Sequence, residues 1–157
     1  MSLKPLRIIA VGKLKTPYWQ EAAAHYLARL KHWRAVEISL LKDGDAALPI
    51  AERNELEGRR ILAACTPQDT LIVMDERGRS FTSPQFSAFV SHVSENAAST
   101  PCFVLGGAFG LSPAVRQAAR HVISLGSMTF PHELARVLLL EQLYRAEAIC
   151  RNVPYHH

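Results

Sequence analysis

Short apolar runs alternate with amphipathic segments along the whole chain. Five runs are rich in branched or aromatic apolar residues, and they cover 7–12, 36–41, 70–74, 101–105 and 122–125. Their length and composition predict strands. The segments that follow carry apolar residues at helical spacing and predict helices over 17–30, over 50–65, from 83, over 113–119 and over 131–150. A strand followed by a helix, five times in succession, predicts an α/β fold in which helices cover a largely parallel sheet in three layers.

Two of these elements are apolar on more than one side. The run 70–74 is almost continuously apolar, which predicts an interior strand with helices over both faces. In the last predicted helix, Val137 to Leu140 are consecutive apolar residues. They spread over more than one helical face and need cover on more than one side. In so small a domain, we expect the second cover to come from another copy of the chain, which makes the protein a homodimer.

The composition is that of one soluble globular domain. The chain has 157 residues, 48% of them hydrophobic and 20% charged. No linker or low-complexity segment divides it, so we expect a single domain over 1–157. No apolar run approaches the roughly 18 residues that a membrane span needs, and the first residues lack the apolar segment of a secretion signal. We therefore expect a cytoplasmic protein that has no membrane partner.

Cysteine spacing and charge narrow the possible chemistry. Cys65, Cys102 and Cys150 are odd in number and far apart, which argues against a disulfide framework or a zinc site and predicts reduced core residues. No His/Cys spacing elsewhere indicates a metal. A formal charge of +4 and a pI near 9.2 are compatible with a polyanionic partner, because binding phosphates releases counterions. The mixed charges of 50–65 are those of a surface helix, to which we assign no chemistry.

Two of the predicted strands end in loops of small residues. Gly106 to Gly110 follows the run 101–105, and Leu125 to Phe130 follows the fifth run. Ligands of open α/β sheets bind beyond the carboxyl ends of the strands, so two such ends predict one pocket. Glycines let the backbone approach a ligand, although a plain tight turn explains the same residues. The spacing matches neither a Rossmann loop nor a Walker lysine loop, and no acidic residue follows at the Rossmann distance.

Candidate polar residues gather at both ends of the last predicted helix. His132 and Arg136 are four residues apart and share a helix face next to the expected pocket, although a charged first helical turn explains them as well. Arg145 follows a glutamate by four residues, a spacing that also suits a plain ion pair. In the tail, Tyr155 and His156 combine a ring that can stack on a base with an imidazole that can exchange a proton.

Several motifs occur together in one order. They are Leu105-Gly106-Gly107-x-x-Gly110-Leu111-Ser112, Met128-Thr129-Phe130-Pro131-His132, Arg136-Val137, Glu141-Gln142-Leu143-Tyr144-Arg145-Ala146 and Pro154-Tyr155-His156. In this order, and over nearly the whole chain, the sequence resembles the SPOUT-class methyltransferases. Among them it is similar to the RNA methyltransferase H family, which methylates N3 of a pseudouridine in 23S ribosomal RNA. The resemblance implies a deep trefoil knot over about 103–150, a rare exception to unknotted chains, a C-terminal tail over 151–157 and a homodimer.

The resemblance also implies a reaction and its residues. S-adenosylmethionine would bind in the knot against the cofactor-binding residues Met74, Gly106, Gly107, Leu125, Gly126, Ser127, Met128, Thr129 and Phe130. The base, a pseudouridine in the helix 69 loop of an assembled ribosome, would attack the sulfonium methyl in line and lose its imide proton. The implied catalytic residues are His132, Arg136, Arg145, Tyr155 and His156. One of the histidines would accept the proton, and the arginines would stabilise the oxyanion or hold phosphate.

Two positions depart from the family pattern, and other functions stay open. Phe109 stands where many relatives have a polar residue, at the rim of the expected cofactor site, and His157 stands where they usually have lysine or arginine, at an expected phosphate contact. The alternatives are a SPOUT methyltransferase that acts on another RNA, a ribosome-binding protein without catalysis, and a flavodoxin-like nucleotide or flavin binder.

Overall fold

Strands and helices alternate along the chain, as the apolar pattern predicts. The structure, a computed structural model, describes residues 3–155. The strands are β1 (Leu6–Val11), β2 (Val36–Leu41), β3 (Asp69–Ser80), β4 (Thr100–Leu105) and β5 (His121–Ser124). The helices are α1 (Pro17–Lys31), α2 (Ile50–Ala64), α3 (Ser83–Glu95), α4 (Pro113–Ala118) and α5 (His132–Cys150).

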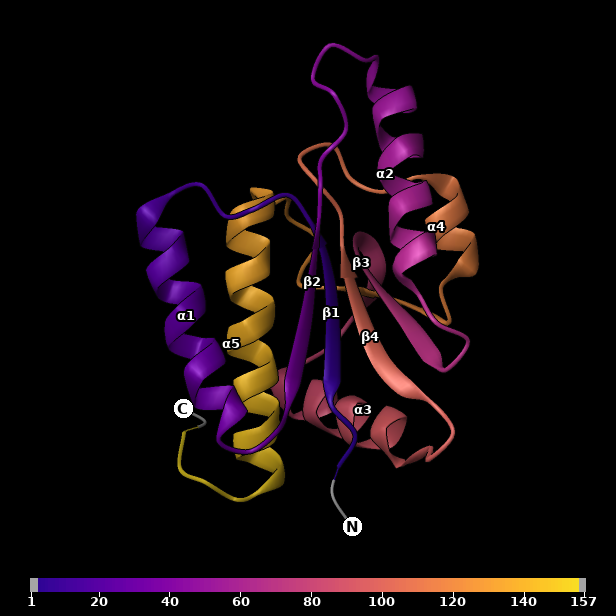
Figure 1. Cartoon of the computed structure of the whole chain (residues 1–157). Coiled ribbons are helices and arrows are strands. Elements are labelled where there is room, and N and C mark those ends of the chain that lie inside the picture. Colours follow the sequence, from indigo (N-terminus) through magenta and orange to yellow (C-terminus); the bar gives the residue numbers. More distant parts are fainter. Residues whose placement is uncertain (1–2, 156–157) are drawn as a thin grey trace.

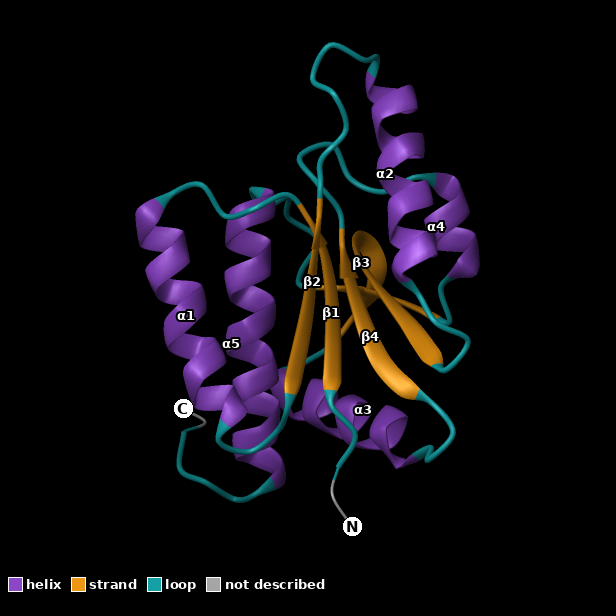
Figure 2. Ribbon diagram, viewed as in Figure 1, coloured by secondary structure: helices purple, strands orange, loops and turns teal. Residues whose placement is uncertain are grey.

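The strands form one parallel sheet in the order β2-β1-β4-β3-β5. Helices α1, α3 and α5 cover one face, and α2 and α4 cover the other (Figures 1 and 2). Alternate residues of β1 enter different cores: Ile8 packs under the first group of helices and Ile9 under the second. The strand is apolar at successive positions because both faces of the sheet are covered. The expected three-layer α/β fold is confirmed.

The third strand is longer than the sequence predicts. The apolar pattern stops at Met74, where the sequence predicts the end of the strand. β3 instead continues to Ser80, with an irregularity between Met74 and Arg79 after which it pairs with β5 again. Gly78 allows this pairing, because a Cβ there would lie 2.6 Å from backbone atoms of Val122. The polar end of β3 therefore lies along β5 instead of forming a free loop.

Helix α5 is covered by other helices of the same chain. It packs against both α1 and α3, and its inward residues Leu139, Leu140 and Leu143 are at most 2% exposed. These inward residues need no second copy for cover, and cover of the remaining side of α5 by another copy stays a prediction. A partly exposed stripe remains along the helix, and we call it the outer stripe: Leu134, Leu138, Glu141, Arg145 and Ile149.

The starts of α1 and α3 are fixed by different polar contacts. Thr16 precedes α1, but its side chain makes no capping hydrogen bond. Its hydroxyl donates to the carboxylate of Glu133, at 2.8 Å. Helix α3 is capped by Thr82 and Gln85 in a reciprocal capping box, and Ser83 is already its first residue. The Thr16 contact links the start of α1 to the start of α5.

The three cysteines are free thiols, but only one lies in the core. Cys102 is buried, Cys65 is half-buried and Cys150 is exposed. No helix within residues 3–155 is long and apolar enough to cross a membrane. In the same described residues, no group of three or more His, Cys, Asp or Glu side chains is placed to hold a metal ion.

Candidate functional site

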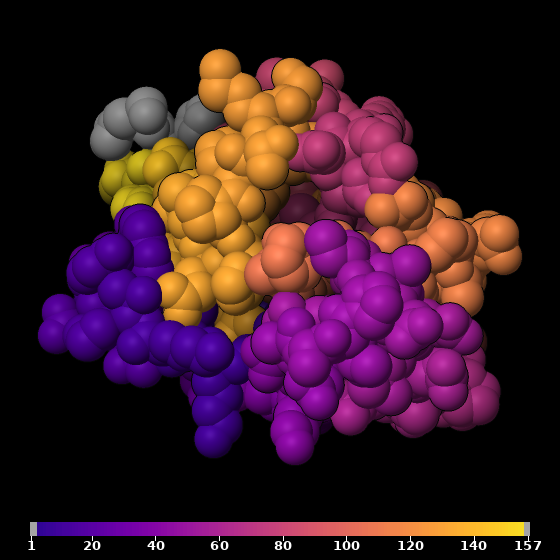
Figure 3. All heavy atoms as spheres, turned by 90° about the horizontal axis from the view of Figure 1, so that it is seen from above, coloured from indigo at the N-terminus to yellow at the C-terminus, as the bar shows by residue number. Residues whose placement is uncertain are grey.

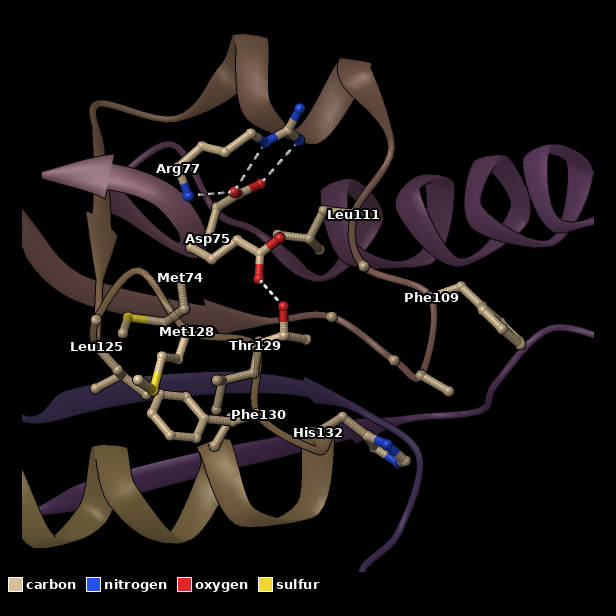
Figure 4. Close-up of a pocket in the computed structure, with 18 of the residues that line it drawn as sticks. Met74, Asp75, Arg77, Phe109, Leu111, Leu125, Met128, Thr129, Phe130 and His132 are labelled. Atoms are coloured by element: carbon tan, nitrogen blue, oxygen red, sulfur yellow. Dashed lines mark hydrogen bonds and ion pairs between the residues drawn. The ribbon is translucent and has the colours of Figure 1, made fainter.

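The loops after β4 and β5 enclose a cavity at the carboxyl edge of the sheet. Its volume is about 420 Å³. Figure 3 looks onto this edge and shows the hollow between these loops and the end of β3. Side chains from the end of β3, from both loops and from the start of α5 surround it (Figure 4). The prediction of a pocket where two neighbouring strands end is confirmed.

Most of the residues expected to bind a cofactor line this cavity. They are Met74, Gly106, Gly107, Leu125, Gly126, Met128, Thr129 and Phe130. Ser127 belongs to the same loop but is not among the lining residues. The sequence interpretation missed four charged lining residues, Asp75, Glu76, Arg77 and Arg116. The first three directly follow the apolar part of an interior strand, and that position was the signal that could have found them.

The backbone of the Gly106–Gly110 loop requires glycine at its first and last positions. A Cβ on Gly106 would lie 2.7 Å from the carbonyl oxygen of Gly110. Gly110 itself has a φ of +86°, in the left-handed region that favours glycine. Its N–H donates to the carbonyl of Gly107 at 3.2 Å. The loop is therefore a tight turn that also forms a cavity wall, and the approach of its backbone to a ligand stays a prediction.

Hydrogen bonds fix the loop after β5. The Ser124 hydroxyl donates to the carbonyl of Gly126 at 2.6 Å and accepts from the N–H of the same residue at 3.0 Å. The Thr129 hydroxyl donates to the carboxylate of Glu76 at 2.6 Å and so ties the loop to β3 (Figure 4). Between these two anchors, Met128 is 78% exposed. A flexible apolar side chain at the cavity wall is suited to cover a bound ligand.

A carboxylate with two cationic partners lies on the wall formed by β3. Asp75 accepts from the backbone N–H of Arg77 at 2.9 Å and from its Nε at 3.2 Å, and the Nε of Arg116 lies 2.8 Å from the other carboxylate oxygen. Burial raises the pKa of Asp75, but these hydrogen bonds and the charge of Arg116 outweigh it, so the net pKa is below the usual value. Asp75 is therefore ionised at neutral pH and can accept further hydrogen bonds.

A second cavity, of about 290 Å³, adjoins the first. Both are lined by Gly107, Ala108 and His132. The residues that line only the second cavity are Val11, Lys15, Thr16, Asp43, Arg53 and Glu133. Of the three shared residues, only His132 has a side chain that can exchange a proton at neutral pH. An imidazole on a wall common to two cavities is suited to act on a group that reaches from one to the other.

Arg136 lies one helical turn beyond His132 and contacts the end of β1. Its guanidinium donates to the carbonyl of Val11 at 3.1 Å and to that of Gly12 at 2.8 Å. The residue is 5% exposed, and burial lowers the pKa of its guanidinium. Arg136 is not among the residues that line either cavity, so the expected position beside His132 in the pocket is not found. These contacts are those of a residue that holds the β1–α1 loop.

Glu133 holds the same loop from the first turn of α5. Its carboxylate accepts from the backbone N–H of Lys15 and from both the N–H and the hydroxyl of Thr16. These bonds, the one from Lys15 first, lower the pKa of Glu133. The loop that carries the exposed side chains of Lys13 and Lys15 is therefore fixed beside the second cavity.

Arg145 and Tyr155 form a separate group toward the other end of α5. The Nε of Arg145 donates to Glu141 at 2.9 Å, Tyr155 donates to the same carboxylate at 3.4 Å, and the guanidinium lies 4.8 Å from the tyrosine ring centroid. Burial, followed by the charge of Glu141, raises the pKa of Tyr155. Along a helix, thirteen positions from His132 to Arg145 correspond to about 20 Å. One chain thus divides the expected catalytic residues into two groups, and His156 lies outside the described residues.

The chain matches one protein family over nearly its whole length. Residues 5–156 match the family described as "Predicted SPOUT methyltransferase". The chain belongs to the SPOUT methyltransferase family. It is similar over its full length to proteins named "Ribosomal RNA large subunit methyltransferase H". That of Desulfovibrio desulfuricans is 59% identical over 157 residues, with 100% of both chains covered. That of Lawsonia intracellularis is 50% identical over 157 residues, again with 100% of both covered. That of Maridesulfovibrio salexigens is 44% identical over 155 residues, with 99% of each covered.

A solved structure offers a more distant comparison for this SPOUT methyltransferase. The SpoU methyltransferase AviRb from Streptomyces viridochromogenes, in complex with the cofactor AdoMet, is 14% identical. The similarity has a TM-score of 0.47 and covers 92% of this chain and 58% of that chain. Family membership therefore rests on the sequence matches and not on this structure.

Proposed function

We propose that this SPOUT methyltransferase transfers a methyl group from S-adenosylmethionine to N3 of a pseudouridine in the helix 69 loop of 23S ribosomal RNA, on the assembled ribosome. The observation that carries the proposal is 59% identity, over the full length of both chains, with a protein named for methylation of large-subunit ribosomal RNA. The choice of pseudouridine and of helix 69 rests on the family resemblance of the ordered motifs.

The larger cavity has the properties that S-adenosylmethionine requires. Its volume of about 420 Å³ lies in the range of roughly 300–1,000 Å³ that is usual for small-ligand sites. Leu125, Met128 and Phe130 offer apolar contacts for the adenine and for the methylene groups of the methionine moiety, and the ionised Asp75 offers an acceptor for hydroxyl or ammonium groups. When bound, the cofactor supplies an electrophilic methyl group on a sulfonium. At Gly106 and Gly107 the backbone is free to approach a ligand, and its N–H and C=O groups can form hydrogen bonds to adenine without a nucleotide-binding motif.

We assign the target base to the second cavity, which shares the His132 wall with the cofactor cavity. His132 accepts the N3 proton of the base, because a neutral imidazole is a suitable base at neutral pH. Lys15 and Arg53 at the same cavity compensate phosphate charge near the base. Arg136 acts indirectly, since its contacts hold the loop that carries Lys15.

We propose a homodimer because one chain keeps its expected catalytic residues about 20 Å apart along α5. If two α5 helices pack antiparallel about a two-fold axis, the end of α5 that carries Arg145 in one copy lies beside the end that carries His132 in the other. The half-buried Leu134 and Leu138 supply apolar contacts for such a seam. The composite site then contains the proton acceptor and the arginine that stabilises the oxyanion.

We also propose that the chain is knotted, as the family fold implies. β5 lies at an edge of the sheet beside β3, yet the helix that follows it packs against β4 in the interior and against α1 and α3. The connection that lines the cofactor cavity therefore crosses back over the sheet. Such a return path is the one that a knotted connection needs.

The reaction is tested by transfer of labelled methyl from S-adenosylmethionine to ribosomes that lack the modification. We expect transfer to intact ribosomes and little transfer to free 23S RNA, whereas a SPOUT enzyme for another RNA would label neither. His132→Ala should lose most of the transfer while still binding cofactor. Near full transfer by His132→Ala and by His156→Ala would show that no histidine is the base.

The composite site is tested by mixing two inactive variants. His132→Ala and Arg145→Ala each damage a different half of the site, so a mixed dimer regains one intact site. An equal mixture, after subunit exchange, should recover about a quarter of the wild-type sites. A mixture that stays inactive although exchange is complete would contradict a site shared between two copies.

A further inference from the structure

Glu57 is a buried carboxylate that the proposed reaction does not use. It lies in α2, the helix whose mixed charges indicated only a solvated surface, yet it is 3% exposed. Burying an ionised carboxylate is costly unless charge and hydrogen bonds compensate it. A residue of this kind needs a structural explanation, and its surroundings provide one.

The carboxylate of Glu57 lies between two loops at the carboxyl edge of the sheet. One oxygen, Oε2, accepts from the backbone N–H of Gly44 at 2.8 Å and lies 3.5 Å from the Nε of Arg53. The other oxygen, Oε1, faces Gly107: a Cβ built on that glycine would lie 2.9 Å from it. The carboxylate therefore fills the space that a side chain at position 107 would need, and it fixes the β2–α2 loop at the same time.

Two more side chains of α2 hold the next part of the same glycine loop. Asn54 donates from its Nδ2 to the carbonyl of Phe109 at 3.0 Å. The guanidinium of Arg53, paired with Glu57, lies 5.2 Å from the centroid of the Phe109 ring, within the range of a cation–π contact. Positions 53, 54 and 57 face the same side of a helix. Helix α2 thus contacts the Gly106–Gly110 loop at its second and its fourth residue.

We propose that Glu57 is a positioning residue for the Gly106–Gly110 loop. Its carboxylate fixes Gly107 against the cavity and orients Arg53 on Phe109. Because Gly107 and Ala108 line both cavities, the position of this loop sets the shape of both. The inference rests on the proposed placement of S-adenosylmethionine in the larger cavity. It gives α2, on the opposite face of the sheet from α5, a function in cofactor affinity.

The test measures cofactor affinity by calorimetry, without ribosomes. Glu57→Ala should weaken S-adenosylmethionine binding by about tenfold or more, and methyl transfer at saturating cofactor and ribosomes should fall by a smaller factor than the cofactor affinity does. Glu57→Gln keeps the volume and the acceptor for Gly44, so it should restore part of the affinity. Asn54→Ala removes one loop contact without unpairing a buried charge, and we expect about threefold weaker binding.

The matched control is Glu147→Ala. Glu147 is 4% exposed and is also ion-paired, with Arg34 at 3.0 Å, but it contacts neither cavity loop. Its loss should lower stability at least as much as Glu57→Ala does and leave cofactor affinity within about twofold of wild type. Equal loss of affinity in both variants would mean general destabilisation and would overturn the proposal.

A double-mutant cycle separates this inference from the proposed function. Gly107→Ala should weaken cofactor binding by itself, and in the Glu57→Ala background its effect should shrink, because the atom it collides with is gone. Wild-type affinity in Glu57→Ala and Asn54→Ala, with weakened binding in Gly107→Ala, overturns the inference alone. Wild-type affinity in Gly107→Ala, or no binding by the wild type, contradicts the placement of the cofactor and the inference together.

Discussion

The sharpest structural prediction concerns Arg136, which the motifs suggest as a catalytic residue and the structure uses to hold a loop. Arg136 is 5% exposed, and its guanidinium donates to the carbonyls of Val11 and Gly12. Arg136→Met keeps much of the side-chain volume but removes both hydrogen bonds. Two carbonyl oxygens at the end of β1 then lose a charged donor in the interior. We expect a loss of stability and a looser β1–α1 loop.

The size of this effect follows from the two hydrogen bonds. A hydrogen bond to a charged group contributes about 1.5–3 kcal/mol, and part of the loss is offset because a guanidinium no longer has to be buried. A net destabilisation of about 2–4 kcal/mol results. For a chain of 157 residues, an unfolding entropy of about 0.33 kcal/mol/K converts this to a Tm lower by about 6–12 °C.

Thermal unfolding and methyl transfer on the same preparations decide between the two roles of Arg136. Arg136→Lys retains a cation that reaches at most one carbonyl well, so its Tm should fall between those of wild type and Arg136→Met. At a temperature where every variant is folded, transfer at saturating substrates should fall far less than it does in His132→Ala. Unchanged stability of Arg136→Met together with a loss of transfer of about a hundredfold or more would refute the reasoning and restore Arg136 as a catalytic residue.

Two further predictions use groups outside the site. Burial, followed by the charge of Arg120, lowers the pKa of His121. As the pH falls, His121 therefore takes up a proton in the unfolded chain before it does so in the folded protein. The free energy of unfolding is not reduced by this residue above about pH 6.5 and decreases below it. Between pH 7.5 and 5.5, the free energy of unfolding measured with urea should fall less steeply with pH in His121→Phe than in wild type. The same pH dependence in both proteins would contradict the lowered pKa of His121. Among the thiols, burial raises the pKa of Cys102 to about 12. A disulfide reagent should therefore label the exposed Cys150 first and Cys102 only on unfolding. Mass spectrometry that finds Cys102 labelled in the folded protein would contradict its burial in a closed core.

The fold could be predicted from the sequence because each strand and helix carries its own signal. Buried strands such as β1 are continuously apolar since both faces are covered, and a proline at one of the first two helical positions marks the start of α1, α3 and α4. The extension of β3 carried no such signal. It depends on Gly78, whose backbone meets Val122 on a strand about forty residues later, and a glycine in a polar segment indicates a turn equally well.

The location of the pocket was predictable, but the roles of several side chains were not. Strand ends followed by glycine-rich loops indicate a pocket through topology alone. The direction in which Arg136 points depends on the loop after β1, which lies far away in the sequence. Glu57 resembles its exposed neighbours along α2, and only the packing of α2 against Gly107 shows that it is buried. Long-range contacts of this kind leave no local pattern.

The most direct test of the central claim is mass spectrometry of ribosomal RNA. Ribosomes that lack the modification are incubated with the protein and S-adenosylmethionine, and fragments that contain the helix 69 loop are sequenced by mass. We predict one added methyl group, on a pseudouridine of that loop and on its base, with wild-type protein, and far less of it with His132→Ala. A methyl group at another nucleotide, or RNA that stays unmodified although the protein binds the cofactor, would contradict the proposed function.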